Sequence, residues 1–218
     1  PLIRLGQDLV GQAQTGTGKT TAFGLPIIET VNKRSRHPQA LVLTPNRELA
    51  LQVSEEISRI GMYQDFKAVA IYGGQPLQPQ VEVLRQGVQV IVATPGRLMD
   101  HIRRRTLSLT SIKVVVLDEA DQMLDIGFIT DIEFILSQVP RSRQTLLFSA
   151  TIPPPIRRLT RFYLKNPQWV RIGGEAEPVD QVAQIYYEVA AQDRRVALRE
   201  VLDEDVTKGL IFRRTKVG

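Results

Sequence analysis

The stretch GQAQTGTGKTTAF, residues 11–23, combines glycines, a lysine and threonines in an order that could bind phosphate. The usual phosphate-binding loop reads G-x-x-x-x-G-K-[S/T], and counting back from the GKT at 18–20 places Ala13 at its first glycine. The alternative is a glycine-rich turn that merely resembles such a loop. A strand before the loop and a helix after it would favour the phosphate-binding interpretation.

Both flanking elements are predicted. Residues 8–13 are short and apolar enough for a buried strand, and the run after Lys19 has a mostly apolar face suited to a helix. Gly16 and Gly18 would allow backbone N–H groups to point at an anion at the helix N-terminus. Lys19 would then neutralise phosphate charge, and the Thr20 hydroxyl would ligate Mg²⁺.

A second chemical feature is VVVLDEAD, residues 114–121, where an apolar strand ends in acids. Asp118 could hold Mg²⁺, and Glu119 could orient or deprotonate an attacking water. A bland turn after a strand would also carry acids. Together with a phosphate loop, however, the pair predicts the Mg²⁺-binding part of an ATPase.

Composition excludes several classes of site. The chain has 218 residues, no cysteine and only two histidines, His37 and His101, which makes a thiolate metal site, a cysteine nucleophile or a histidine triad unexpected. We find no apolar run of membrane-spanning length and no basic and apolar leader at the amino end. We therefore expect a cytoplasmic protein without a membrane partner; composition says nothing of its oligomeric state.

Charge divides the chain into two regions. Residues 1–172 carry 21 Lys and Arg against 14 Asp and Glu, whereas residues 173–218 carry 7 against 9. The basic excess of the first region is compatible with a polyanionic partner. Residues 173–182 contain glycines, a proline and acids, and we predict a linker there.

Short β-branched runs alternate with helix-like segments in the first region, which predicts an α/β fold with a parallel sheet covered on both faces. Ligands of such a sheet bind beyond the carboxyl ends of its strands. Trp169 is predicted to pack on the last strand. Beyond residues 8–13, the expected strands are 40–44, 67–72, 88–94, 112–118 and 144–150.

The motifs AQTGTGKT, PNRELA, GG, TPGR, DEAD and SAT occur in that order, and together they resemble the first RecA-like domain of a DEAD-box ATP-dependent RNA helicase. In this family the phosphate loop begins with alanine, which accounts for Ala13. The resemblance implies a RecA-like P-loop three-layer sandwich with a mostly parallel sheet. It assigns residues 1–172 to an ATP- and RNA-binding domain and residues 183–218 to the start of a second RecA-like domain.

The resemblance also implies the cofactors and the catalytic residues. ATP and Mg²⁺ would be bound, with Lys19, Asp118 and Glu119 as catalytic residues and Thr20 and Asp118 as Mg²⁺ ligands. The nucleotide would contact the loop residues Ala13, Gln14, Thr15, Gly16, Thr17, Gly18, Lys19 and Thr20.

The RNA partner, a single strand or short duplex, would be contacted mainly through its backbone. Arg47 could instead form a first-turn ion pair with Glu48, the two glycines could be a plain turn, and Thr94 could be an ordinary helix cap. Asn46 replaces the threonine of the family motif, and its amide can both contact phosphate and cap a helix. The implied RNA-contacting residues are Pro45, Asn46, Arg47, Gly73, Gly74, Thr94, Pro95, Gly96 and Arg97.

The hydroxyls of Ser149 and Thr151 would bond Asp121 and couple the ATP state to the binding of RNA, although they could instead cap the helix after Pro153.

The resemblance implies that the family's adenine-reading motif would lie upstream of Pro1, and only an opening strand, helix and strand of the second domain are expected after residue 182. We therefore expect the chain alone to be nearly inactive. The full-length protein would unwind RNA with RNA-stimulated ATPase activity; alternatives are an ATP-gated RNA clamp or annealing module and, more weakly, a DNA helicase.

Overall fold

A computed structural model describes residues 1–14, 16–172, 185–190, 192–203, 209 and 211. Its contacts divide the chain into two compact units, Pro1–Gly174 and Glu175–Gly218, which we describe separately. The predicted linker at 173–182 lies outside the described residues. The linker and the assignment of the domains therefore stay predictions.

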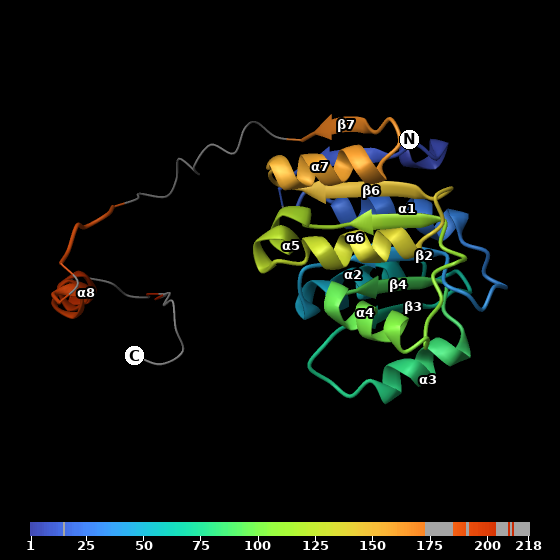
Figure 1. The fold of residues 1–218 in the computed structure, drawn as a ribbon, viewed down its shortest axis with the longest axis horizontal. Coiled ribbons are helices and arrows are strands. Elements are labelled where there is room, and N and C mark those ends of the chain that lie inside the picture. Colours follow the sequence, from blue (N-terminus) through green and yellow to red (C-terminus); the bar gives the residue numbers. More distant parts are fainter. Residues whose placement is uncertain (15, 173–184, 191, 204–208, 210, 212–218) are drawn as a thin grey trace. The chain divides into compact units, whose positions relative to one another are not determined.

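The first unit is built around a seven-stranded sheet in the order β3-β4-β2-β5-β6-β1-β7, with β7 and β3 at opposite ends in Figure 1. Every recorded strand pair is parallel. The six strands predicted from the sequence are confirmed. Their bounds are β1 Leu9–Gln12, β2 Ala40–Leu43, β3 Ala68–Ile71, β4 Val90–Ala93, β5 Val114–Leu117 and β6 Gln144–Ser149, followed by β7 Gln168–Arg171.

Side chains of the central strands are buried on both faces of the sheet. In β2, Ala40 and Val42 belong to one buried cluster, whereas Leu41 and Leu43 belong to the other. This alternation is the period of two of a β-strand, and it explains why the central strands are continuously apolar.

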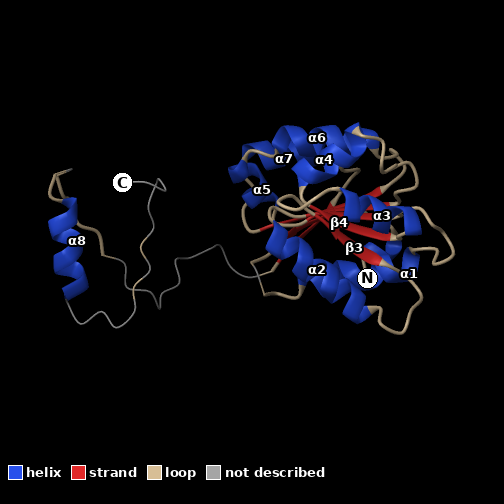
Figure 2. Ribbon diagram, turned by 90° about the horizontal axis from the view of Figure 1, so that it is seen from below, coloured by secondary structure: helices blue, strands red, loops and turns tan. Residues whose placement is uncertain are grey.

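Helices cover both faces and complete the three layers seen in Figure 2. Buried side chains of α1 and α2 belong to one cluster, and those of α3 to α7 to the other. The predicted α/β three-layer fold is confirmed. The helices are α1 Lys19–Thr30, α2 Arg47–Ile60, α3 Gln78–Gln86, α4 Pro95–Arg103, α5 Ala120–Ile126, α6 Ile129–Gln138 and α7 Pro154–Tyr163, with a short 3₁₀ turn at Ile3–Leu5.

Helix α1 continues through Gly24 and Pro26, residues that usually weaken a helix. Phe23 and Ile27 are fully buried against the sheet. Burial of this apolar face outweighs the poor intrinsic propensity of the segment.

Strand β7 pairs with β1 and ends the sheet. Trp169 lies on this edge strand and is 57% exposed. The prediction that Trp169 is a packing residue was therefore wrong, because an edge strand lacks the neighbouring strand and helix that would cover a large side chain.

The second unit contains α8, Arg194–Asp203, which agrees with the helix predicted there. The strand predicted before it does not form, since residues 185–190 have no regular structure and Ile185, Tyr186 and Tyr187 are exposed. A strand needs a neighbour to pair with, and no other strand occurs among the described residues of this unit. Nowhere in the described part of the chain is a helix both long and apolar enough to cross a bilayer.

Close packing of β1 against β6 gives a stability prediction. A Cβ added at Gly11 would meet the ring of Phe148 at 2.6 Å, so Gly11→Ala should lower the free energy of unfolding by about 1–3 kcal/mol. Gly24→Ala is the matched control: its Cβ would make ordinary 3.4 Å contacts with Ile57 and Ile60, inside a helix. Urea unfolding followed by circular dichroism should show a lower unfolding midpoint for Gly11→Ala. Gly24→Ala should have a higher midpoint, because alanine is favoured over glycine inside a helix. An unchanged midpoint for Gly11→Ala would contradict this explanation.

Candidate functional site

The predicted functional segments follow the carboxyl ends of six parallel strands and therefore meet at one edge of the sheet. The phosphate loop, the two acids and the SAT segment follow β1, β5 and β6, which are adjacent in the order β5-β6-β1. The three predicted RNA-contacting segments follow β3, β4 and β2, which are also adjacent. Strand order thus separates the two groups into neighbouring halves of one edge.

The loop between β1 and α1 has the backbone geometry of an anion-binding loop. Gly16 and Gly18 have φ angles of 78° and 81°, and Gly18 directly precedes α1. A Cβ at either position would meet nothing within 4 Å, so the space beside both glycines is open. The Thr17 hydroxyl donates to the Gln14 carbonyl at 2.9 Å and tightens the loop. Thr15 lies outside the described residues.

Lys19 and Asp118 face each other across the adjoining strand ends. The Lys19 Nζ donates to the Ala13 carbonyl at 3.4 Å and lies 3.9 Å from Asp118 Oδ1. Asp118 is only 3% exposed, and burial raises the pKa of its carboxyl to about 6, although the Lys19 charge opposes this rise. A buried pair of opposite charges without a short hydrogen bond between them destabilises the fold. Such pairs are typical of functional sites.

Glu119 occupies the left-handed backbone region, with φ 54° and ψ 53°, between β5 and α5. For a non-glycine residue this conformation carries strain. Burial raises the pKa of the Glu119 carboxyl, the negative Asp121 raises it further, and Lys19 opposes both. A raised pKa makes Glu119 a better proton acceptor than an ordinary surface carboxylate.

The residues present fit Mg²⁺ bound together with a phosphate. Asp118 Oδ1 is buried without a hydrogen-bond partner, and a hard cation would satisfy such an oxygen. Thr20 lies in the first turn of α1, one residue after Lys19. The part of the chain that the structure describes holds no cluster of three or more His, Cys, Asp or Glu suited to a metal. A magnesium site here would thus use few protein ligands, as Mg²⁺ sites on phosphate substrates do.

Asp121 is joined to the SAT segment by hydrogen bonds. The backbone N–H and the hydroxyl of Thr151 donate to Asp121 Oδ2 at 2.8 and 3.0 Å. The Ser149 hydroxyl accepts from the Asp121 N–H at 3.1 Å. Burial alone would raise the pKa of Asp121, but these bonds and one from the Gln122 N–H lower it. Helix α7 begins after Pro153 without a side-chain cap, so the hydroxyls of Ser149 and Thr151 do not cap this helix.

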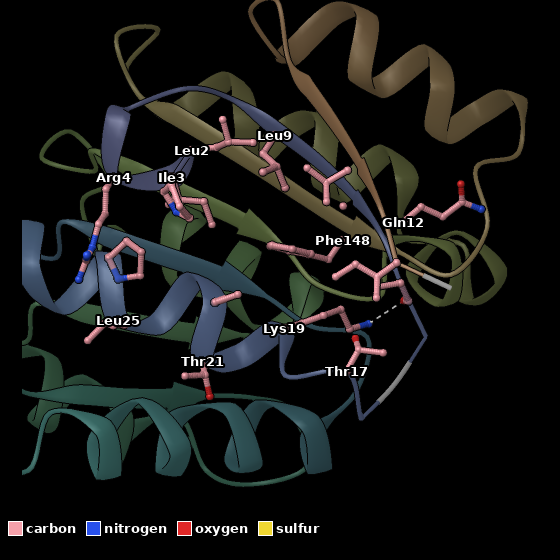
Figure 3. A pocket seen from close by; sticks show the side chains of 17 residues that line it. Leu2, Ile3, Arg4, Leu9, Gln12, Thr17, Lys19, Thr21, Leu25 and Phe148 are labelled. Carbon is pink, nitrogen blue, oxygen red and sulfur yellow. Dashed lines mark hydrogen bonds between the residues drawn. The ribbon is translucent and has the colours of Figure 1, made fainter. Parts of the chain in front are cut away.

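An apolar cavity of about 530 Å³ adjoins the phosphate loop. Figure 3 shows Lys19 and Thr17 at its polar side, with Leu2, Leu9 and Phe148 among the labelled apolar side chains. A flat apolar ring attached to a phosphate chain would suit this combination of walls. Gln12 also lines the cavity and donates to the Ala150 carbonyl at 3.1 Å, which ties β1 to the SAT segment.

Pro45, Asn46 and Arg47 lie at the start of α2. Asn46 is the N-cap, and its Oδ1 accepts from the Leu49 N–H at 2.9 Å, so the replacement of threonine keeps the capping function. The Arg47 guanidinium stacks over the Tyr72 ring at 4.9 Å. No ion pair joins Arg47 to Glu48 in the described structure, which argues against the first-turn pair considered above.

The turn after β3 is exposed at Gly73 and Gly74, whereas at the start of α4 Thr94 and Pro95 are buried and Gly96 is half-buried. At Gly73, Gly74 and Gly96 an added Cβ would meet nothing within 4 Å. Thr94 occupies the N-cap position of α4 but makes no capping hydrogen bond, so the simple cap alternative fails. Pro95 follows as the first helical residue, where its missing N–H costs nothing.

Arg97 is mostly buried, with 11% of its side chain exposed. Its Nη2 donates to the Gln75 carbonyl at 2.8 Å, its Nε lies 3.8 Å from Asp100, and its Nη1 is buried without a partner. Direct contact of Arg97 with RNA stays a prediction, since most of the guanidinium faces protein.

Sequence reasoning missed Tyr72, Gln75 and Gln12, which connect the predicted motifs to one another. Tyr72 directly precedes the two glycines, and its position between a strand and a predicted RNA-contacting turn was an available signal. Gln12 and Gln75 had no signal in the sequence. The Gln12 amide donates to the Ala150 carbonyl, and the Gln75 carbonyl accepts from Arg97, so both contacts depend on residues distant in the chain.

Comparison with protein families supports the motif-based interpretation. The sequence model of the DEAD/DEAH box helicase family matches residues 1–159. Over 217 residues the chain is 48% identical to the DEAD-box ATP-dependent RNA helicase CshA of Bacillus licheniformis, covering 99% of this chain and 45% of the relative. It is 49% identical to the protein of the same name in Geobacillus kaustophilus, covering 99% and 46%. The chain thus spans about half the length of the curated relatives it matches.

Solved structures show the same likeness. A DEAD box protein from Methanococcus jannaschii aligns with a TM-score of 0.76 and 40% identity, covering 94% of this chain and 55% of that one. A hypothetical ATP-dependent RNA helicase from Sulfolobus tokodaii aligns with a TM-score of 0.73 and 41% identity, covering 79% and 50%. The resemblance derived from the motifs and the RecA-like fold are confirmed.

The raised pKa of Asp118 gives a prediction about stability and pH. Between the ordinary value of 3.8 and about 6 the folded chain holds this proton and the unfolded chain loses it, so the contribution of Asp118 to stability falls as pH rises through that window and stays low above it. Asp118→Asn should therefore raise the free energy of unfolding at pH 8 by at most about 3 kcal/mol, reduced by the loss of the Lys19 contact, with little effect near pH 4. Urea unfolding across this range measures the difference; parallel curves for the two proteins would refute it.

Proposed function

Since the chain belongs to the DEAD/DEAH box helicase family, we propose that it is the ATP- and RNA-binding part of an ATP-dependent RNA helicase. The complete protein would couple ATP binding and hydrolysis to local unwinding of RNA duplexes. RNA and ATP are both abundant in the cytoplasm, and we propose that location for it.

The observation that carries the proposal is the approach of Lys19 Nζ to the buried, unpartnered Asp118 Oδ1 at 3.9 Å, beside an open glycine loop. A lysine held this way can neutralise the charge of a phosphate chain, while the neighbouring carboxylate binds the cation that accompanies the phosphates. A purely structural ion pair would instead close to hydrogen-bonding distance.

In this proposal the loop residues from Ala13 to Thr20 surround the phosphates, and Lys19 neutralises their charge. Thr20 and Asp118 hold Mg²⁺, which when bound supplies positive charge to the transferring phosphoryl group. Glu119 orients the attacking water and accepts its proton on the side-chain carboxylate. The apolar cavity next to Lys19 accommodates the base.

RNA would lie across the ends of β3, β4 and β2. Two strand spacings separate β3 from β2, roughly 10 Å, which is enough to follow a short stretch of nucleic-acid backbone. The exposed backbone at Gly73 and Gly74, the open space beside Gly96, and the amides at the starts of α2 and α4 suit phosphate contacts. Such contacts read backbone rather than sequence.

Coupling between the two halves would pass through Asp121 and Thr151. Asp121 lies two residues after the proposed base Glu119, and its carboxylate accepts two hydrogen bonds from Thr151. A shift of the DEAD segment on nucleotide binding would therefore move the SAT segment with it. Asp121, Ser149 and Thr151 are thus the proposed coupling residues.

Catalysis would need more than this chain. A phosphoryl-transfer transition state gains about 10³–10⁵ in rate from an additional arginine, and no arginine here matches that motif. Arg213 and Arg214 lie outside the described residues. We propose that a second RecA-like domain, begun at residues 183–218, supplies this charge, and that the chain alone is nearly inactive.

The phosphate role of Lys19 can be tested by Lys19→Ala. Removing a charge-assisted contact should weaken binding of ATP with Mg²⁺ by roughly 10- to 100-fold, while the far-ultraviolet circular dichroism stays unchanged. Lys67→Ala is the control, because the exposed Lys67 precedes β3 at the opposite edge of the sheet. Isothermal titration calorimetry measures both. Equal affinities of a folded Lys19→Ala variant and the wild type would exclude Lys19 as a phosphate ligand.

Hydrolysis tests the role of Glu119. In a protein of the relatives' full length, Glu119→Gln should retain binding of ATP and RNA, but RNA-stimulated phosphate release should fall by about 10²–10⁴ because proton acceptance is lost. Strand displacement of a short RNA duplex should fall with it. Turnover at the wild-type rate would require another base.

The same assays distinguish a helicase from an RNA clamp, and the activity of the full-length protein from that of the 218-residue chain. ATPase activity without strand displacement in the full-length protein would favour the RNA clamp. Strong RNA-stimulated phosphate release by the 218-residue chain without added second domain would contradict the two-domain mechanism.

A further inference from the structure

A chain of buried polar side chains connects α4 with the turn after β3. His101 of α4 is 0% exposed, and Gln80 of α3 is 4% exposed. His101 Nε2 lies 3.1 Å from Gln80 Oε1, and Gln80 Nε2 donates to the Tyr72 carbonyl at 2.9 Å. At the other end, His101 Nδ1 lies 2.8 Å from the Thr106 hydroxyl. None of these four residues belongs to the predicted motifs.

The Tyr72 carbonyl determines the direction of the two bonds that link it through Gln80 to His101. A carbonyl only accepts, so the Gln80 amide must present its N–H to Tyr72 and its Oε1 to His101. His101 must then carry a proton on Nε2. In the neutral ring Nδ1 accepts from the Thr106 hydroxyl, which also lies 3.2 Å from the His101 carbonyl. Burial lowers the pKa of His101, and the nearby positive charge of Arg97 lowers it further, which agrees with a neutral ring.

Tyr72 needs such a donor because of its place in the sheet. It follows the last residue of β3, an edge strand, where no further strand supplies N–H groups. A buried carbonyl without a donor would be costly. Gln80 meets this requirement from α3, and His101 prevents the amide from turning round.

The short segment from Tyr72 to Gln75 is thereby held from three helices. Arg47 of α2 stacks on the Tyr72 ring at 4.9 Å, Gln80 of α3 holds the Tyr72 carbonyl, and Arg97 of α4 holds the Gln75 carbonyl at 2.8 Å. Between the two held carbonyls, Gly73 and Gly74 face open space. Fixed ends with an exposed middle are the arrangement expected of a preorganised binding turn.

We propose that Gln80 and His101 are positioning residues for nucleic-acid binding: through the Tyr72 carbonyl they hold the Gly73 and Gly74 backbone in the conformation that receives an RNA phosphate. This inference rests on the proposed RNA-binding function and extends it to residues outside the motifs. Neither residue touches RNA, and neither takes part in nucleotide binding.

Gln80→Met tests the proposal in the 218-residue chain, because methionine keeps the length of the side chain but removes both its donor and its acceptor. Gln78→Met is the matched control, the same change on an exposed position of the same helix. The probe is a fluorescein-labelled ten-nucleotide uridine RNA, with a non-hydrolysable ATP analogue and Mg²⁺. We expect the Kd for RNA to rise roughly three- to tenfold in Gln80→Met and to stay unchanged in Gln78→Met.

Two further measurements distinguish positioning from general packing. Amide hydrogen exchange without RNA should accelerate at Gly73 and Gly74 in Gln80→Met, while the affinity for the ATP analogue stays the same. The double variant Gln80→Met with His101→Leu removes both polar partners, so its urea midpoint should recover part of the stability lost in Gln80→Met. Its RNA affinity should remain low, since the Tyr72 carbonyl still lacks its donor.

The outcomes separate this proposal from the proposed function. Wild-type RNA affinity in Gln80→Met, or RNA affinity that recovers together with stability in the double variant, would overturn the positioning role and leave the proposed function standing. Failure of both the wild-type chain and Gln78→Met to bind the RNA would overturn the proposed function and the positioning role together.

Discussion

Parallel pairing of the strands is the constraint on which the candidate site depends. In a parallel sheet all carboxyl ends point to one edge, so segments separated by more than a hundred residues, such as Gly18 and Ser149, are brought to neighbouring strand ends. Parallel strands require crossovers, and the helices of these crossovers bury both faces of the sheet. The apolar character of the strands and the polar character of the loops at their ends are therefore two results of one architecture.

At this edge the requirements of function oppose those of stability. Asp118 is a buried carboxylate whose Oδ1 lacks a hydrogen bond, and Glu119 has a left-handed backbone conformation. Each costs free energy that the two apolar clusters on either side of β5 offset. In the proposed function, a divalent cation would satisfy the Asp118 Oδ1 that lacks a hydrogen bond.

The edge beyond β3, β4 and β2, where RNA is proposed to bind, is organised differently from the edge beyond β5, β6 and β1. Besides the buried Arg97 Nη1, which has no hydrogen-bond partner, it presents exposed backbone at Gly73 and Gly74. Side chains of α3 and α4 bond to the Tyr72 and Gln75 carbonyls on either side of these glycines. Arg47 and Arg97, which the motifs suggested as phosphate contacts, make contacts with Tyr72 and Gln75. Side-chain contacts thus join the three segments that sequence reasoning treated as separate RNA contacts.

The sequence alone predicted the fold class and the six strands before β7, and it marked the phosphate loop and the DEAD segment as candidate sites, because apolar runs and motif spacing are local properties. It did not reveal which strands are neighbours. Strand order places β3, β4 and β2 side by side, and it brings Asp121 to Thr151, a contact that only the family resemblance implied. The exposure of Trp169 and the hydrogen bond between Gln80 and His101 could likewise not be predicted, since burial and hydrogen-bond partners depend on elements distant in the chain. Local pattern specifies which residues can do the chemistry, whereas long-range packing decides which of them meet.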